Sequence, residues 1–187
     1  SAQVDPPAPL RLAWFSPWLT DPPDQILGLA WDPAAEAVFI AGSRLSGPDR
    51  GAFIERRDLQ GTIRWSRRIS DVPVDAAAAV LLAPDGDVLV GGSSFRMIGA
   101  RSYGGQDAFV MKLRADSGQT VWAGQAGSPD ADWVGDMAVD ARGHVYLAGE
   151  TLGVVAEGGV YAGESDVFVV EFDASGTWLA AWQEGSP

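Results

Sequence analysis

Short apolar runs, each followed by a turn, repeat along the chain in groups of four. The first two runs of each group are separated by a tight hairpin and lie within residues 25–43, 76–93 and 133–150. The third runs cover 52–55, 107–112 and 166–171, and the fourth runs, after a glycine turn, begin at 61–65, 118–122 and 176–180. Short runs bounded by Asp, Gly and Pro, with no helical period anywhere, are typical of β-strands. An all-β chain is therefore predicted.

Particular residues also recur at the same place in each group. Trp14, Trp65 and Trp122 stand 51 and 57 residues apart, and the last group has Ala180 at this place. Each tryptophan is followed ten residues later by an aspartate, at Asp24, Asp75 and Asp132. A sandwich or a barrel also has short strands but does not require the same residues in every unit. The pattern predicts a β-propeller built of four-stranded antiparallel blades, with three blades plus one extra N-terminal outer strand.

This pattern divides the chain into a short tether and one repeat domain. Three prolines in residues 1–9 predict an extended Pro-rich tether. Residues 10–187 form a single propeller-type domain, with the outer strand at 10–19, blade one at 24–66, blade two at 75–123 and blade three at 132–184. Three blades do not close a ring, so we expect either closure by an oligomer or a further part of a longer propeller.

The repeats resemble the bacterial β-propeller repeats known as SBBP repeats. The resemblance is carried by residues 104–113 (GGQDAFVMKL), 118–122 (GQTVW) and 138–151 (AVDARGHVYLAGET). Blade one departs from the pattern at residues 51–57 (GAFIERR), where Asp, Val and Lys are usual. The resemblance implies a secreted protein or one on the bacterial cell surface, without catalysis, and it names no ligand.

Composition and charge exclude several classes of partner and chemistry. The net charge of −12 argues against nucleic acid and anionic membranes as partners. No apolar run is long enough for insertion into a membrane. The chain has no cysteine, which removes thiol catalysis and cysteine metal sites, and we expect no cofactor and no metal.

Few residues are candidates for catalysis, and we predict no enzyme. The single histidine, His144, lies in a hairpin turn and is expected to be a solvated turn residue. The repeated aspartates Asp24, Asp75 and Asp132 suggest calcium, but no dense acidic loop surrounds them. We therefore expect each carboxylate to accept backbone N–H bonds in the turn that enters the inner strand.

The long loops between second and third strands carry aromatic side chains that suit sugar stacking or protein contacts. The candidate ligand-binding residues are Trp18, Phe95, Tyr103 and Tyr161. The alternative is that these rings fold back over the blades as small satellite clusters.

Charge is distributed unevenly and suggests self-assembly. Residues 44–68 hold seven arginines against three acids, whereas residues 115–187 hold twelve acids against Arg142 alone. In a six-bladed ring of two chains, basic blade one of one copy would meet acidic blade three of the other. The candidate assembly residues are Arg56, Arg57, Arg67, Arg68, Glu157, Glu164 and Glu171.

The leading prediction of function is therefore a non-catalytic module for protein–protein interaction or self-assembly. A glycan-binding lectin is the alternative, and a carboxylate-dependent hydrolase is third.

Overall fold

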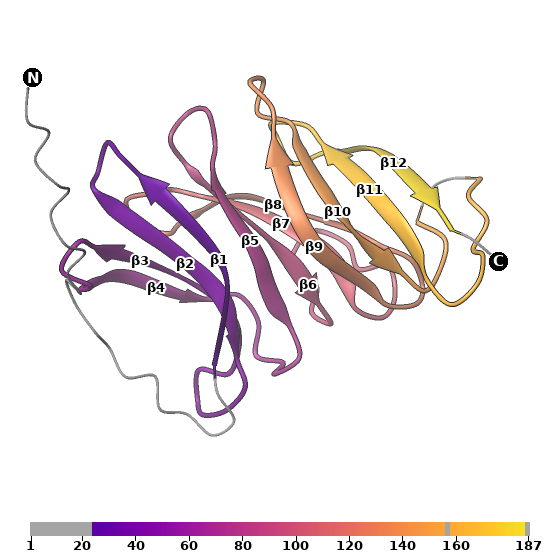
Figure 1. Cartoon of the computed structure of the whole chain (residues 1–187), viewed down its shortest axis with the longest axis horizontal. Helices are drawn as coiled ribbons and strands as arrows, with labels where there is room; N and C mark the ends of the chain where they lie inside the picture. Colours follow the sequence, from indigo (N-terminus) through magenta and orange to yellow (C-terminus); the bar gives the residue numbers. More distant parts are fainter. Residues whose placement is uncertain (1–23, 156–157, 186–187) are drawn as a thin grey trace, which may run out of the picture.

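The computed structural model describes residues 24–155 and 158–185, which form twelve strands in three separate sheets (Figure 1). Blade one contains β1 (Gln25–Asp32), β2 (Ala37–Arg44), β3 (Gly51–Asp58) and β4 (Ile63–Arg68). Blade two contains β5 (Ala76–Leu82), β6 (Val88–Ser94), β7 (Asp107–Leu113) and β8 (Thr120–Ala126). Blade three contains β9 (Asp132–Val139), β10 (Val145–Thr151), β11 (Asp166–Phe172) and β12 (Trp178–Glu184).

Each sheet is an antiparallel meander in which the strands pair in chain order. The prediction of an all-β chain with three four-stranded antiparallel blades is confirmed. Strands β4 and β8 extend two and three residues beyond the predicted blade ends at 66 and 123. The predicted tether at 1–9 and the outer strand at 10–19 lie outside the described residues.

The first strand of each blade carries or faces a β-bulge, and a glycine on the second strand makes room for it. In blade two the register shifts between Ala77 and Ala79, opposite Gly92. A methyl group on Gly92 would overlap the carbonyl oxygen of Ala76, and Gly42 and Gly149 are equally close to the first strands of their own blades. This crowding explains why the second apolar run of every repeat ends in Ala-Gly or Gly-Gly.

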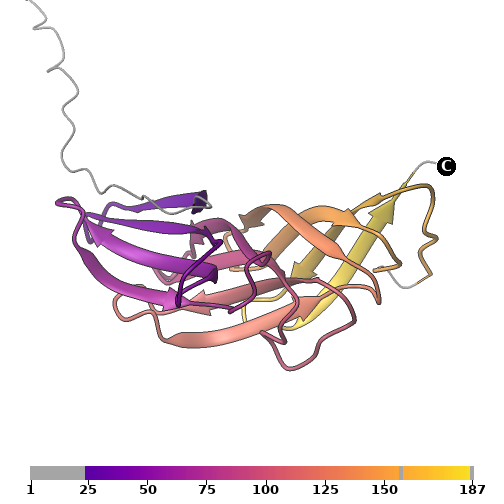
Figure 2. The same cartoon turned by 90° about the horizontal axis from the view of Figure 1, so that it is seen from below.

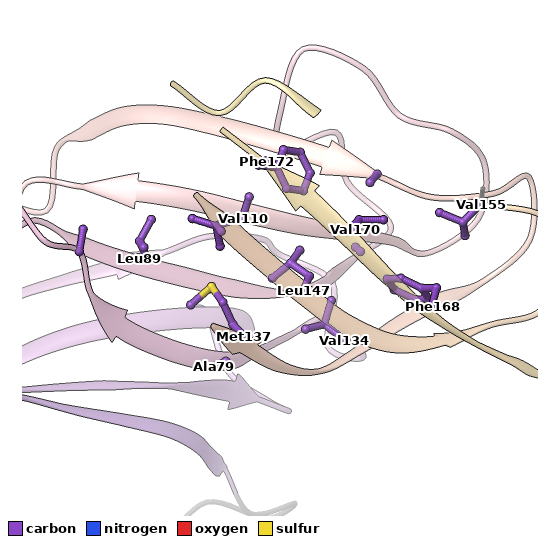
Figure 3. Packing of buried hydrophobic residues seen from close by; sticks show 14 residues of the cluster. Ala79, Leu89, Val110, Val134, Met137, Leu147, Val155, Phe168, Val170 and Phe172 are labelled. Atoms are coloured by element: carbon purple, nitrogen blue, oxygen red, sulfur yellow. The ribbon is translucent and has the colours of Figure 1, made fainter. Parts of the chain in front are cut away.

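The blades pack face to face and share two apolar cores. Between blades one and two, Phe39, Ile54, Val90 and Phe109 belong to one buried cluster. Between blades two and three, the buried cluster includes the residues labelled in Figure 3, among them Val110, Leu147, Phe168 and Phe172. Figure 2 shows from another side that the three sheets follow one another in chain order.

Because side chains alternate along a strand, each blade has two distinct faces. We call the face toward the next blade in chain order the leading face, and the opposite one the trailing face. Ile54 in blade one and Val110 in blade two lie on leading faces, in the two buried clusters. Strand pairing makes Val169 the equivalent residue of blade three.

A tryptophan of each of the first two blades reaches the next blade. The indole N–H of Trp65 donates to the carbonyl oxygen of Ala115 (3.0 Å), and that of Trp122 donates to Ala174 (2.9 Å). A methyl group would lie 2.9 Å from the Trp65 ring if built on Gly118, and 2.5 Å from the Trp122 ring if built on Gly176. The repeat of Trp and turn glycine is therefore a contact between successive blades.

Among the described residues, no helix is long and apolar enough to span a membrane.

Candidate functional site

The leading face of blade three exposes side chains at positions that the other blades bury. Val167 and Val169 are 60% and 36% exposed, whereas their equivalents Ala108 and Val110 in blade two are fully buried. Trp182, which pairs with Val169, is 52% exposed. This face is therefore an apolar sheet surface without a covering sheet in the described chain. Glu150 and Glu184 are exposed beside it.

Polar side chains occupy the other half of this leading face. His144 Nδ1 donates to Glu171 Oε1 (2.8 Å), and the Tyr146 hydroxyl donates to the same oxygen (3.1 Å). The hydrogen bond from His144 lowers the pKa of the Glu171 carboxyl, although partial burial opposes it. The prediction that His144 is a solvated turn residue is wrong, because strand pairing brings Glu171 of the third strand beside the hairpin turn.

Most of the predicted assembly arginines do not point toward a second copy. Arg57 is only 5% exposed, and it binds Glu55, which is 1% exposed, at 2.7 Å. Arg67 donates to the carbonyl oxygen of Gly118 in blade two (2.9 Å), and Arg56 shares the leading face with Ile54. The assembly prediction is wrong for these three residues, because strand alternation turns Arg56 and Arg67 toward blade two, and Arg57, on the trailing face, is buried against Glu55.

Arg68 lies on the trailing face of blade one, is exposed, and donates to the carbonyl oxygen of Pro48 (2.7 Å). Of the predicted acids, Glu171 is held by His144 and Tyr146, Glu164 is exposed in a loop, and Glu157 lies outside the described residues.

The predicted aromatic ligand surface does not form one cluster. Phe95 is 51% exposed, and the Tyr161 hydroxyl donates to the carbonyl oxygen of Glu164 (2.6 Å). Tyr103 instead packs against Trp178 of blade three, with ring centroids 5.2 Å apart and ring planes at 83°. Trp18 lies outside the described residues.

Tyr103 and Trp178 border a groove of about 580 Å³ between blades two and three. Arg101 and Tyr103 come from the loop of blade two, and Trp178 and Ala181 from β12. The guanidinium carbon of Arg101 lies 4.6 Å from the centroid of the Tyr103 ring. Sequence reasoning missed Trp178 as a site residue. The one sequence feature that pointed to a contact at this place was the length of the 95–106 loop, which is long enough to reach the following blade.

Two of the three repeated aspartates, Asp75 and Asp132, link the two ends of a hairpin, while Asp24 Oδ2 lies 3.9 Å from Arg44 Nε. Asp75 accepts from the Phe95 N–H (2.9 Å) and the Ser94 hydroxyl (2.5 Å). Asp132 accepts from the Ser128 N–H (2.7 Å) and the Thr151 hydroxyl (2.5 Å). The predicted bond to a backbone N–H group of the turn entering the inner strand is confirmed for Asp132, whereas the backbone donor to Asp75 is Phe95, which follows the second strand. In the part of the chain that the structure describes, no three His, Asp or Glu side chains are grouped to hold a metal ion.

Asp107 and Asp132 bring two buried carboxylates together at the boundary between blades two and three. A methyl group on Gly127 would lie 2.5 Å from Asp107 Oδ1 and 2.7 Å from Asp132 Oδ2. Asp107 Oδ1 has no hydrogen-bond partner in the described chain, whereas Oδ2 accepts from Ser102, Tyr103 and Gln125. Burial raises the pKa of Asp132, and the charge of Asp107 adds to the effect.

We expect Asp107→Asn to raise the free energy of unfolding by about 1 kcal/mol at pH 7. The new amide N–H replaces the unpartnered oxygen and faces Asp132, while the amide oxygen keeps the three existing bonds. A raised carboxyl pKa means that stability is highest when Asp132 is protonated and falls as pH rises through its folded pKa. The gain from the substitution should therefore shrink toward pH 4.

Urea unfolding of the unchanged protein and of Asp107→Asn at pH 7 and pH 4 measures this difference in stability. Asp166→Asn is the matched control, because Asp166 is the equivalent residue of blade three and both of its oxygens accept hydrogen bonds. That variant should be neutral or destabilised. A loss of stability in Asp107→Asn at pH 7 would contradict the repulsion between the two carboxylates.

Comparison with known proteins supports the fold. No family model and no curated protein matches the chain. One similar solved structure, described as a GH43_12 retrieved from capybara gut metagenome, has 8% identity and a TM-score of 0.54, over 84% of this chain and 30% of that one. Another, described as a eukaryotic initiation factor, has 10% identity and a TM-score of 0.46, over 86% and 32%.

The chain thus spans about a third of the length of the solved structures it matches. The GH43 structure has a β-propeller fold, and its similarity to the three blades described above confirms the prediction of a β-propeller. The resemblance to SBBP repeats stays a prediction.

Proposed function

We propose that this protein is a non-catalytic β-propeller module for protein–protein interaction, including assembly with copies of itself. The observation that supports the proposal is that the leading face of blade three is exposed, whereas the leading faces of blades one and two are each covered by the next blade. Contiguous exposed apolar side chains rimmed by polar residues are typical of interaction surfaces. The resemblance to SBBP repeats adds the proposal that the module is secreted or lies on the bacterial cell surface.

The chemistry of this face indicates what should cover it. Val167, Val169 and Trp182 offer apolar contact, while Glu150 and Glu184 favour a partner with positive charge at its rim. Blade three also has Ala180 at the position of Trp65 and Trp122, so it lacks the tryptophan that clasps the next blade. A partner sheet would therefore pack here without the indole contact used within the chain.

A second copy offers such positive charge on the trailing face of its blade one. Arg64 and Arg68 are exposed on β4, on the same side as Phe53. Arg64 is paired with Asp58 (2.7 Å), so Arg68 supplies the positive charge there. The centre of that face contributes little charge to a contact, because Glu55 binds both Arg44 and Arg57 there. Closure of two chains into a six-bladed ring would therefore rest on the exposed Leu29 and Trp31 of β1 and the outer strand in blade one, and on the apolar half of blade three.

Light scattering tests self-assembly. At micromolar concentration and low salt, we expect the intact chain to have twice the mass of 19.7 kDa, because burial of the exposed apolar side chains favours association. The double variant Val169→Ser with Trp182→Ser should be a monomer. Met97→Ser, which changes a 65% exposed residue of a blade-two loop, is the control and should leave the mass unchanged. A monomeric intact chain under these conditions would refute self-assembly.

A glycan-binding function is the second candidate, and the groove between Tyr103 and Trp178 favours it. Aromatic rings at a groove offer the flat apolar faces on which sugars stack.

A further inference from the structure

The groove between blades two and three has rigid aromatic walls. The indole N–H of Trp178 donates to the carbonyl oxygen of Ala180 (2.9 Å), which fixes the orientation of the ring. The backbone N–H of Tyr103 donates to the buried Asp107 (2.9 Å), and its ring packs edge to face with Trp178. The two rings are therefore positioned before any ligand arrives, and binding would not have to order them.

The charge of the groove is opposite to that of the whole molecule. The protein has a net charge of −12, yet the groove is lined by no acidic side chain among the residues described. Its lining consists of small and apolar residues, the two aromatic rings and Arg101. From the described lining residues, a ligand in the groove therefore meets one positive charge and no negative charge.

Arg101 also differs from the other cations of blades two and three. Arg96, Lys112, Arg114 and Arg142 each form an ion pair with an aspartate, at 2.5 to 3.0 Å. In the described chain Arg101 has no ion pair, and its guanidinium is held over the ring of Tyr103. A guanidinium stacked on a ring keeps its N–H groups available to a carboxylate in the ring plane.

We propose that this groove binds an oligosaccharide of uronic acids, with the sugar faces on Tyr103 and Trp178 and a sugar carboxylate on Arg101. The inference rests on the second candidate function and specifies its ligand. Aromatic rings select for the apolar faces of pyranose rings, and a guanidinium forms two parallel hydrogen bonds to a carboxylate. The groove, about 580 Å³ in volume and lined by loops of two blades and by β12, is larger than a single small polar group requires.

Calorimetry and tryptophan fluorescence on the intact chain test the proposal with tetragalacturonate as the probe. We expect binding that weakens with salt, and a loss of at least about tenfold in affinity in Arg101→Gln, because a charge-assisted bidentate bond is lost. Tyr103→Ala should weaken binding similarly. The controls are Arg142→Gln, an exposed arginine of the next blade, and Phe95→Ala, an exposed aromatic residue of the same loop. Both should bind as the unchanged protein does.

Two further probes and the Arg101→Gln variant show which part of the proposal fails if binding is not as expected. The same oligosaccharide with its carboxyl groups reduced to alcohols should bind at least about tenfold more weakly. If it binds as tightly, or if Arg101→Gln has no effect, the acidic specificity is refuted and the glycan function stands. If neither oligosaccharide binds, both are refuted. If tetraglutamate binds as well as tetragalacturonate, the groove recognises carboxylates without recognising sugars, and the proposal is again overturned.

Discussion

Gly92→Ala is expected to lower the free energy of unfolding by about 3 kcal/mol or more. The added methyl group would overlap the carbonyl oxygen of Ala76, which belongs to the backbone of the neighbouring strand. A flexible side chain could move away, but here β5 itself must shift, and β5 packs against the first strands of both other blades. The cost should therefore appear as a loss of global stability, measured by urea unfolding.

Gly135→Ala is the control, because Gly135 lies at the same bulge on the first strand of blade three, but its added methyl group would meet only the Ala148 carbonyl oxygen, at 3.9 Å. Alanine restricts the unfolded chain more than glycine does, so this variant should be neutral or slightly stabilised. Equal losses in the two variants would contradict the close approach at the bulge. Gly42→Ala and Gly149→Ala should behave as Gly92→Ala does, since their methyl groups would meet equivalent carbonyl oxygens.

Trp122→Ala is expected to cost about 3 to 5 kcal/mol of stability. The substitution removes a large ring that packs against the core between blades two and three, together with its hydrogen bond to Ala174. It also leaves an empty space next to Gly176. The backbone of Gly176 has a positive φ of 84°, which fixes the turn, so the turn does not move in to fill that space. Thermal and urea unfolding should both show the loss.

Trp182→Ala provides the control for the loss of a tryptophan as such. Trp182 is on the exposed leading face of blade three, so in the monomer its replacement should cost under about 1 kcal/mol. Equal losses at Trp122 and Trp182 would contradict the role of Trp122 as a clasp between blades. The measurement should be made at a concentration low enough to exclude association, because Trp182 is also part of the proposed assembly surface.

The blades differ in how they satisfy one repeated position. Glu171 of blade three corresponds to Lys112 of blade two, so the charge at this position is reversed. Lys112 pairs with Asp85, whereas Glu171 accepts a hydrogen bond from His144. Because each strand residue keeps a partner in the hairpin turn, the change alters the charge presented to a neighbour without disturbing the blade.

The sequence by itself was sufficient to predict the strands and their grouping into blades. These features depend on local period, on turn residues and on residues that recur at equal spacing, and all three are visible along the chain. Trp65 and Trp122 are examples, since the glycines they contact recur in the same repeat. The structural role of the Asp75 and Asp132 carboxylates as hydrogen-bond acceptors was predicted from the same recurrence.

Only the tertiary structure decided which charged and aromatic side chains are available to a partner. Counting charges over residues 44–68 treats Arg57, Arg67 and Arg68 alike, although the first is buried with Glu55, the second contacts blade two and the third is exposed. Likewise, nothing in the sequence places Tyr103 beside Trp178, which follows it by 75 positions. Strand alternation assigns a residue to one of two faces, but which face meets another blade depends on how the sheets pack in space.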